Sequence, residues 1–223
     1  MNFYREVHEG DLVYRVNLSD YLDTGLFLDA RKKRTLIRAD AAGKRVLNLF
    51  AYTCSLSVCA AKGSASQVDS VDLSNTYLEW GRINFALNGL QAHDVVESGS
   101  FTLGSSALSG LNLIRGDVLQ FINHARKNGL RWDLIILDPP SFSNSKKMRD
   151  MLDLRRDHLE LIRKGLSLLS PGGTLWFSTN AKGIRLDAED FPDVELKEMG
   201  KVLVDDDFRG RRMPVCYMLV KPF

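Results

Sequence analysis

The sequence predicts an α/β fold built on a mostly parallel, doubly wound sheet. Two observations carry this prediction: short apolar runs alternate with longer amphipathic segments, and an acidic residue directly follows several of the runs. Alternating strands and helices are typical of parallel sheets, because two parallel strands need a long, right-handed connection. A chain of 223 residues suits one such domain with a substantial core and leaves no room for a second full domain.

The first part of the chain has a different pattern. Residues 3–18 alternate apolar and polar side chains around Gly10, which predicts a β-hairpin with its turn at that glycine. We expect residues 1–24 to form a small N-terminal appendage and residues 25–223 to form the main domain.

The main domain then alternates helices and strands. Strands are expected at residues 46–50, 68–72, 113–115, 134–137, 174–178 and 215–220. Helices are expected at residues 26–43, 55–62, 75–88, 118–127 and 151–169. The Pro-Gly-Gly of residues 171–173 predicts a turn before the fifth strand. Residues 91–110 are rich in Ser and Gly without periodicity, which predicts an exposed loop.

The composition indicates a protein of the reducing cytoplasm. Three cysteines are an odd number, and their spacing matches no metal motif, so neither disulfides nor a metal site is expected. The polar, charged start does not resemble a signal peptide, and no apolar run approaches the roughly 18 residues of a membrane span. We therefore expect no membrane association.

The net charge of +2 does not by itself indicate a nucleic-acid partner. Basic residues nevertheless gather at 31–34, 146–149, 155–156 and 209–212. A charge run on a helix usually marks a solvated face, which is the simpler interpretation of 155–156. The other two late clusters fall on expected loops near strand ends. We therefore expect them to contact RNA phosphates through Lys146, Lys147, Arg149 and Arg211.

Residues 132–142 are the most informative string, because an apolar strand leads directly into Asp138, two prolines and Phe142. Ligands of open α/β sheets bind beyond the carboxyl ends of the strands, so Asp138 is placed for chemistry. Pro139 and Pro140 stiffen the turn and leave carbonyl oxygens free to accept hydrogen bonds. Beside them Phe142 offers a face on which a base can stack, so the string indicates an enzyme acting on a nucleobase. The alternative is an ordinary end of a strand.

Two further acidic residues follow strands and indicate a nucleoside cofactor. The turn after the first strand lacks Gly-x-Gly-x-x-Gly, which disfavours a dinucleotide and favours S-adenosylmethionine. Asp72 ends the second strand, where a carboxylate can accept from both hydroxyls of a ribose. Asp117, after the third strand, either holds the adenine amino group or caps the next helix.

Five strings closely resemble the RlmK half of the RlmKL ribosomal RNA methyltransferases. They are YLDTGLFLD at 21–29, LNLFAYT at 47–53, SVDLSNTYLEW at 70–80, LDPPSFSNSK at 137–146 and FSTN at 177–180. The resemblance implies a Rossmann-like class I methyltransferase with a seven-stranded sheet, which uses S-adenosylmethionine to methylate N7 of a guanosine in 23S ribosomal RNA. The family's larger proteins also carry an upstream RNA-binding half with a guanine-N2 activity. We expect this chain to be either a free-standing version or one domain of such a protein.

The candidate site residues follow from these patterns. Asp29 and Arg31 recur near the cofactor in the family, and Phe27 is expected either to cover the cleft or to pack in the core. The expected cofactor contacts are Phe27, Asp29, Arg31, Asn48, Phe50, Tyr52, Thr53, Ser55, Asp72, Leu73, Asp117, Val118 and Asp138. The guanine is expected to be held by Asp138, Pro139, Pro140, Phe142 and Asn180.

Cys54 departs from the family pattern, which has glycine after Tyr-Thr. A side chain there costs about 1–3 kcal/mol in strain or lost cofactor contact, so Cys54→Gly is expected to tighten cofactor binding. A non-catalytic RNA-binding relative with an impaired cofactor site is therefore one alternative.

The residue types at the strand ends limit which atom of the base can be methylated. Methylation of cytosine C5 needs a thiolate, and the relevant strand ends carry none; Cys216 is expected to be a buried structural thiol. Guanine N7 owns a lone pair, so that catalysis there reduces to positioning. Enzymes that methylate guanine N2 or adenine N6 share Asp-Pro-Pro-aromatic, so an exocyclic amine remains the alternative target.

Overall fold

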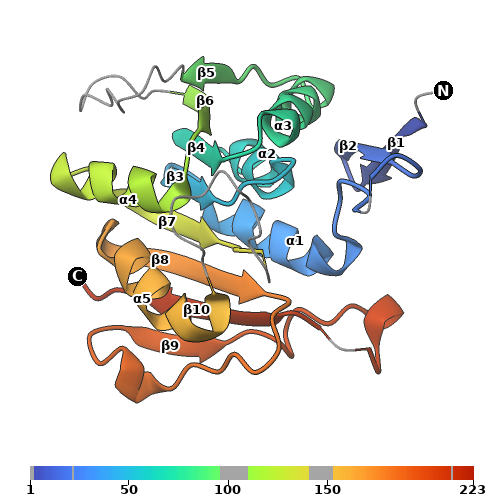
Figure 1. Ribbon diagram of the computed structural model, residues 1–223. Helices are drawn as coiled ribbons and strands as arrows, with labels where there is room; N and C mark the ends of the chain where they lie inside the picture. Colours follow the sequence, from blue (N-terminus) through green and yellow to red (C-terminus); the bar gives the residue numbers. More distant parts are fainter. Residues whose placement is uncertain (1–2, 22, 96–109, 141–152, 212) are drawn as a thin grey trace.

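The computed structural model describes residues 3–21, 23–95, 110–140, 153–211 and 213–223. In these residues the central sheet has the strand order β5-β6-β4-β3-β7-β8-β10-β9 (Figure 1). Six strands are parallel: β3 (Arg45–Leu49), β4 (Gln67–Asp72), β5 (His93–Val95), β6 (Gly110–Arg115), β7 (Trp132–Leu137) and β8 (Leu169–Thr179). The antiparallel strands are β9 (Glu195–Glu198) and β10 (Val215–Val220). The predicted fold class is confirmed.

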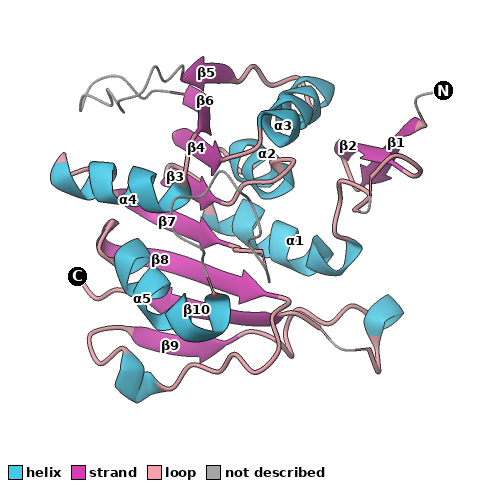
Figure 2. Ribbon diagram, in the orientation of Figure 1, coloured by secondary structure: helices cyan, strands magenta, loops and turns pink. Residues whose placement is uncertain are grey.

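Helices cover both faces of the sheet (Figure 2). One face carries α1 (Arg31–Asp40), α2 (Ser55–Lys62) and α3 (Asn75–Leu87), and the other carries α4 (Val118–Lys127) and α5 (Leu154–Leu166). The alternation of side chains along a strand explains the two layers, because successive residues point to opposite faces. In β3, Val46 packs with Ile37 of α1, whereas Leu47 packs with Phe121 of α4.

The N-terminal hairpin forms as predicted. Its strands are β1 (Tyr4–Glu9) and β2 (Leu12–Asn17), and Gly10 in the turn has a φ of +62°. The hairpin lies beside α3 (Figure 1), where the Asn88 amide donates to the Val13 carbonyl at 2.7 Å and accepts from the Val13 N–H at 3.0 Å. The division into an appendage and a main domain stays a prediction.

The sheet departs from the expected seven strands because two short strands join its edges. In the described residues the sheet has eight strands, and its two edge strands, β5 and β9, are weakly patterned. Strand β9 is a mostly exposed run of charged residues, and β5 has three residues within the segment predicted to be a loop. An exposed edge strand has no apolar run that could reveal it in a sequence. The remaining residues of the predicted loop, 96–109, lie outside the described part of the chain.

Strand β8 begins at Leu169, so the predicted turn at residues 171–173 lies inside the strand. Trp132 of β7 pairs with Leu169, and the register then shifts before Leu134 pairs with Thr174. The Pro-Gly-Gly segment therefore forms an irregularity within the strand rather than a turn before it. Gly172, with a φ of +72°, lies against the ring of Phe223.

Other boundaries move by a few residues. The expected first helix is divided into a 3-10 turn, Leu28–Ala30, and helix α1. Further 3-10 turns lie at Ala188–Asp190 and Asp206–Phe208. None of the helices in the described ranges is long and apolar enough to cross a membrane.

Candidate active site

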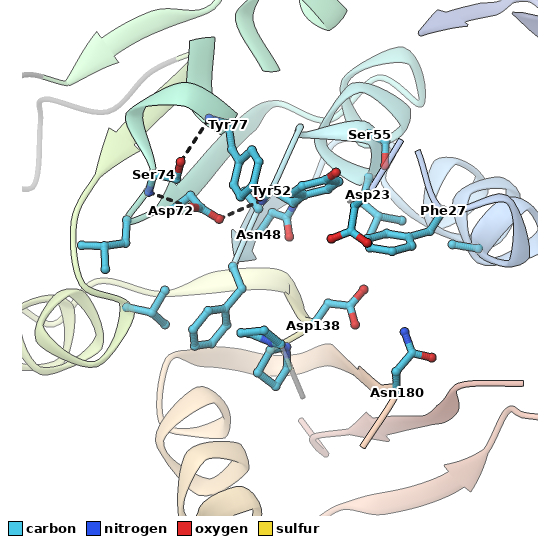
Figure 3. Close-up of a pocket in the computed structure, with 18 of the residues that line it drawn as sticks. Asp23, Phe27, Asn48, Tyr52, Ser55, Asp72, Ser74, Tyr77, Asp138 and Asn180 are labelled. Atoms are coloured by element: carbon cyan, nitrogen blue, oxygen red, sulfur yellow. Dashed lines mark hydrogen bonds between the residues drawn. The ribbon is translucent and has the colours of Figure 1, made fainter. Parts of the chain in front are cut away.

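A cleft of about 700 Å³ opens at the carboxyl ends of the parallel strands (Figure 3). Strands β3, β4, β6, β7 and β8 each end at it, as expected for an open parallel sheet. Most of the predicted site residues line it: Phe27, Asp29, Asn48, Phe50, Tyr52, Ser55, Asp72, Leu73, Asp117, Val118, Asp138, Pro139, Pro140 and Asn180. The fold thus brings together side chains that are far apart in the sequence.

The turn between β3 and α2 has an unusual backbone. Phe50, Tyr52 and Cys54 have φ values of 61°, 51° and 60°, in the left-handed region that favours glycine. Such conformations cost roughly 1–3 kcal/mol each and gather at ligand sites, where the surrounding structure holds them in place. The Ala51 N–H donates to the Val71 carbonyl, which anchors the middle of the turn to β4.

Asp72 anchors this turn at the end of β4. Its carboxylate accepts from the Tyr52 N–H at 2.9 Å through Oδ2 and from the Ser74 N–H at 2.8 Å through Oδ1 (Figure 3). Burial raises the pKa of the Asp72 carboxyl, although these backbone donors lower it. A carboxylate has about four acceptor sites, so each oxygen keeps one for a ligand.

Asp117 is a helix cap and also lines the cleft. Its Oδ1 accepts from the backbone N–H groups of Leu119 and Gln120, at 2.9 and 3.0 Å. The capping role is thereby confirmed. Because both bonds end on Oδ1, Oδ2 is available to a ligand, and contact with adenine stays a prediction.

Aromatic rings form one wall of the cleft. Tyr52 lies between Tyr77, at a ring distance of 4.5 Å, and Phe27, at 5.4 Å. The Phe27 side chain is 43% exposed, so it lines the cleft and is not a core residue. Such a wall suits the apolar parts of a nucleoside ligand.

The other end of the cleft carries Asp138 and Asn180, which follow β7 and β8 (Figure 3). The partner of Asp138 is a residue that the sequence motifs do not mark. Lys33 of α1 reaches between the strand ends, and its Nζ lies 2.7 Å from Asp138 Oδ2 and 2.7 Å from Ser178 Oγ. Its side chain is only 6% exposed, so this is a buried ammonium at the mouth of the predicted base site.

Lys33 belongs to the basic cluster at 31–34, whose four side chains take different directions. Arg31 binds Asp205 and Asp207 at 2.9 and 2.8 Å, and Lys32 donates to the Val204 carbonyl. Arg34 binds Glu9 of the hairpin. A run of charges in sequence cannot show this, because consecutive helical residues point 100° apart.

Two predicted cofactor residues are not part of the cleft lining. Arg31 points to the acidic residues named above, because their carboxylates lie alongside α1. Thr53 is fully buried, and its hydroxyl donates to the Gly25 carbonyl at 2.6 Å, which makes it a structural link. Contact of either residue with the cofactor stays a prediction.

Four predicted residues lie outside the described part of the chain: Phe142, Lys146, Lys147 and Arg149. Arg211 is described, and it lines a second groove of about 860 Å³ that adjoins the cleft at Pro214. Contact of any of these five residues with RNA stays a prediction.

The three cysteines are buried and form no disulfide. Cys54 is fully buried in the core, and its sulfur lies where a Cβ on Gly81 of α3 would have to be. Its side chain is not among the residues that line the cleft, and the effect of Cys54 on cofactor binding stays a prediction. Burial raises the pKa of the Cys216 thiol to about 12, which keeps it protonated at neutral pH, as a structural thiol is.

Known proteins resemble this chain in sequence and in fold. The sequence model of the S-adenosylmethionine-dependent methyltransferases matches residues 3–201. The chain belongs to this family. S-adenosylmethionine, the cofactor predicted from the sequence, is thus the cofactor of the family.

Individual relatives of this methyltransferase confirm the resemblance described above. Ribosomal RNA large subunit methyltransferase K of Neisseria meningitidis serogroup B is 44% identical over 213 residues, which are 95% of this chain and 55% of that protein. Methyltransferase K/L of Saccharophagus degradans is 44% identical over 92% of this chain and 25% of its own length. The crystal structure of SMU.776 complexed with SAH has a TM-score of 0.76 at 29% identity, and the match covers 98% of this chain and 56% of that one. The methyltransferase thus spans between a quarter and about half of the length of these relatives.

The cleft of this methyltransferase fits an adenosyl ligand. Among the described residues, Asn48 Oδ1 and Tyr52 Oη are buried without a hydrogen-bond partner, and both residues line the cleft. Buried polar atoms normally have partners, and a polar ligand that reached these two atoms would supply them. Trp176 Nε1, which does not line the cleft, is a third such atom. Together with Asp72 and Asp117, the two cleft residues offer acceptors for an ammonium group, ribose hydroxyls and an adenine amine.

Proposed function

We propose that this chain methylates N7 of a guanosine in 23S ribosomal RNA. The observation that carries the proposal is the position of Asp138-Pro139-Pro140 and Asn180 at one end of a cleft whose other end holds Asp72 and Asp117. A base at the first end and an adenosyl ligand at the second would meet inside the cleft. The 44% identity to a protein named for the large ribosomal subunit supports the choice of substrate.

On the cofactor side, Asp72 would accept from the ribose hydroxyls and Asp117 from the adenine amine. Asn48, whose amide nitrogen already donates to Ser57 Oγ at 2.9 Å, turns its free oxygen to the ammonium of the methionine part. When bound, S-adenosylmethionine would supply an electrophilic methyl group. Guanine N7 would form the new bond with its own lone pair while the bond from methyl to sulfur breaks and S-adenosylhomocysteine leaves, so that no proton has to be removed.

On the base side, Asp138 and the carbonyl of Pro139 would accept from N1–H and the N2 amine of a guanine turned out of its stack. Asn180 would close this end of the pocket, and Phe142, outside the described residues, is proposed to stack on the base. Residues that only bind and orient are sufficient here, because reaction at N7 depends mainly on positioning.

The proposed RNA contacts are Lys146, Lys147, Arg149 and Arg211. We further propose that 23S ribosomal RNA, or an assembling particle that contains it, is met in the cytoplasm. In the longer relatives, additional chain accompanies the matched region, and an upstream RNA-binding half is a proposed partner of this domain.

Nucleoside mass spectrometry tests the proposal. Unmodified 23S ribosomal RNA is incubated with the protein and isotopically labelled S-adenosylmethionine, and labelled 7-methylguanosine is the expected product. Label in N2-methylguanosine or N6-methyladenosine would keep the enzyme class and reject the target atom. Absence of any labelled nucleoside, with cofactor binding intact, would reject the activity of this chain alone.

A variant at Asp138 tests the assignment of the base site. Asp138→Ala would leave the buried Lys33 without its carboxylate, so the better change is Asp138→Asn, which keeps an oxygen for Lys33. We expect transfer to fall strongly while calorimetric affinity for S-adenosylmethionine is retained. Asp187→Asn, a change at an exposed residue that does not line the cleft, is the control. Full turnover by Asp138→Asn would reject the assignment.

A further inference from the structure

Lys33 is a buried cation at the base end of the cleft. Its side chain is 6% exposed, yet it belongs to the residues that line the cleft. Two of its three N–H donors are accounted for by Asp138 Oδ2 and Ser178 Oγ, both at 2.7 Å. The third donor is therefore available to a ligand in the cleft.

Burying an ammonium is costly, and the surroundings of Lys33 reduce this cost only in part. Asp138 supplies one opposite charge and Ser178 one hydroxyl, while Cys216, on the strand beside Ser178, is a neutral thiol. The attraction between the two charges offsets the cost of desolvation only in part, so the pair by itself contributes little net stability. The position of this pair, at the carboxyl ends of β7 and β8, points to the substrate.

The edge of a purine that carries N7 distinguishes guanine from adenine through a single neighbouring group. Guanine places the acceptor O6 beside N7, whereas adenine places an N6 amine there, which is a donor. An ammonium has only donors. It can therefore bind the guanine edge but opposes the adenine edge.

We propose that Lys33 is the residue that selects guanine, by donating its third N–H to O6 while N7 is methylated. The inference rests on the proposed function and adds to it the means by which the base is recognised. Asp138 then has two tasks: its Oδ2 holds Lys33, and its Oδ1 and the Pro139 carbonyl accept from the opposite, Watson–Crick edge of the same base.

The ion pair also suits the charge that develops in the reaction. Guanine becomes positively charged when N7 acquires a methyl group, and an isolated ammonium beside it would oppose this change. Because Lys33 is paired with Asp138, the two together carry no net charge. The site thus offers a strong donor to O6 without adding a net positive charge beside the ring.

The same arrangement disfavours the N6 amine of adenine as methyl acceptor. That amine would stand where O6 of guanine stands, so that its N–H groups would face the third N–H of Lys33, which is also a donor. The geometry therefore favours N7 over N6 of adenine, which the Asp-Pro-Pro motif alone leaves open.

The first test needs only the natural protein. Once the target nucleotide has been mapped, RNA fragments are made with guanine, 2,6-diaminopurine or hypoxanthine at that position. Diaminopurine replaces O6 with an amine and the N1–H donor with an acceptor, and it keeps N7 and the N2 amine. Hypoxanthine keeps O6, N1–H and N7 and lacks the N2 amine. The reactivity of each N7 toward dimethyl sulfate corrects for intrinsic nucleophilicity. After this correction we expect kcat/KM for guanine to exceed that for diaminopurine by about 30- to 100-fold, as for a hydrogen bond from a charged donor.

The second test uses Lys33→Met, a neutral change of similar length. Asp138 is about one-third exposed on its side chain, so water can replace its lost partner. We expect the preference for guanine over diaminopurine to fall by the part that Lys33 contributes, about 10-fold or more, whereas the part that comes from the contact of Asp138 with N1–H remains. The preference for guanine over hypoxanthine and the calorimetric affinity for S-adenosylmethionine should be unchanged. Lys32→Met is the matched control, because Lys32 is an exposed neighbour that faces Val204 and Asp205, and it should keep the full preference.

The outcomes separate this inference from the proposed function. If the natural protein makes 7-methylguanosine but accepts diaminopurine equally well, or if Lys33→Met lowers activity on both bases by the same factor, the role of Lys33 is rejected and the function stands. If labelled 7-methylguanosine never forms, the function is rejected and this inference with it. If Lys33→Met does not fold, the natural protein decides with 6-thioguanine in place of diaminopurine, because 6-thioguanine keeps N1–H, N7 and the N2 amine and weakens only the acceptor beside N7. Equal corrected kcat/KM for guanine and 6-thioguanine would then reject the role of Lys33.

Discussion

Asp72→Asn is the change that tests the cofactor end of the cleft most directly. The carboxylate accepts from the N–H groups of Tyr52 and Ser74 at 2.9 and 2.8 Å, one on each oxygen, and its two remaining acceptor sites are proposed to take the ribose hydroxyls. An amide has one oxygen fewer. In the variant one backbone donor and one ribose hydroxyl therefore lose their acceptor.

The magnitude follows from the kind of bond that is lost. A hydrogen bond to a charged group contributes about 1.5–3 kcal/mol, so the dissociation constant for S-adenosylmethionine should rise roughly 10- to 150-fold. The unpaired backbone donor should lower the free energy of unfolding by about 1–3 kcal/mol. Titration calorimetry with S-adenosylmethionine measures the first quantity and urea denaturation the second. Asp94→Asn, which changes an exposed carboxylate bound to Arg82, is the control for loss of charge.

The pH dependence gives an independent measurement of the same group. Because burial raises the pKa of Asp72, its charged form is lost at a higher pH than that of an ordinary aspartate. Cofactor affinity of the natural protein should weaken as the pH falls through this raised value, whereas Asp72→Asn should show no such step. For stability the sign is opposite. A raised pKa means that the folded protein binds the proton more tightly than the unfolded chain, so the contribution of Asp72 to stability is present below its pKa in the unfolded chain and is lost as the pH rises through its pKa in the folded protein.

The calorimetric result decides the ribose contact. A change of less than about 2-fold in the dissociation constant of Asp72→Asn for S-adenosylmethionine would refute that contact.

Three further changes test other parts of the structure. Asp117→Ala should lower the free energy of unfolding by about 1 kcal/mol, whereas Asp117→Asn keeps the helix cap; calorimetry on both variants then shows whether the residue also binds cofactor, since equal affinity for all three proteins would exclude it. Arg34→Met leaves Glu9, whose side chain is only 17% exposed, without its partner. We expect the free energy of unfolding, measured by urea denaturation, to fall by about 3 kcal/mol, and to fall less for Glu9→Gln. Unchanged stability of Arg34→Met would contradict the buried pair. Cys54→Gly relieves a strained φ but removes a side chain that is packed against Gly81. Because that side chain does not line the cleft, we expect unchanged affinity for S-adenosylmethionine in calorimetry. The tighter binding expected from the sequence would show that the strained turn weakens cofactor binding in the natural protein.

Much of the candidate site was predictable because of where strands end. Asp72, Asp117 and Asp138 each follow an apolar run, and the topology of a parallel sheet brings such positions to one edge. For Asp117 the sequence left two roles open, a helix cap or an adenine ligand. The hydrogen bonds from the backbone of α4 show that it is a helix cap.

Lys33 shows why other parts of the site could not be predicted. In the sequence it is one of four consecutive basic residues, and nothing local distinguishes it from Lys32. In the fold one of the two is buried against Asp138 and the other is exposed. The difference depends on how α1 lies across the ends of β7 and β8, which are more than 100 residues away in the chain.

The sequence by itself determined the fold class, the family and the residues at the strand ends, because these depend on local periodicity and on short motifs. Only the tertiary structure decided the direction of each charged side chain, the packing of Cys54 against Gly81, the burial of Thr53 and the edge strands β5 and β9. The physical reason is that burial and ion pairing are properties of the whole packed molecule. A side chain's partner is set by which distant elements come into contact, and no window of sequence contains that information.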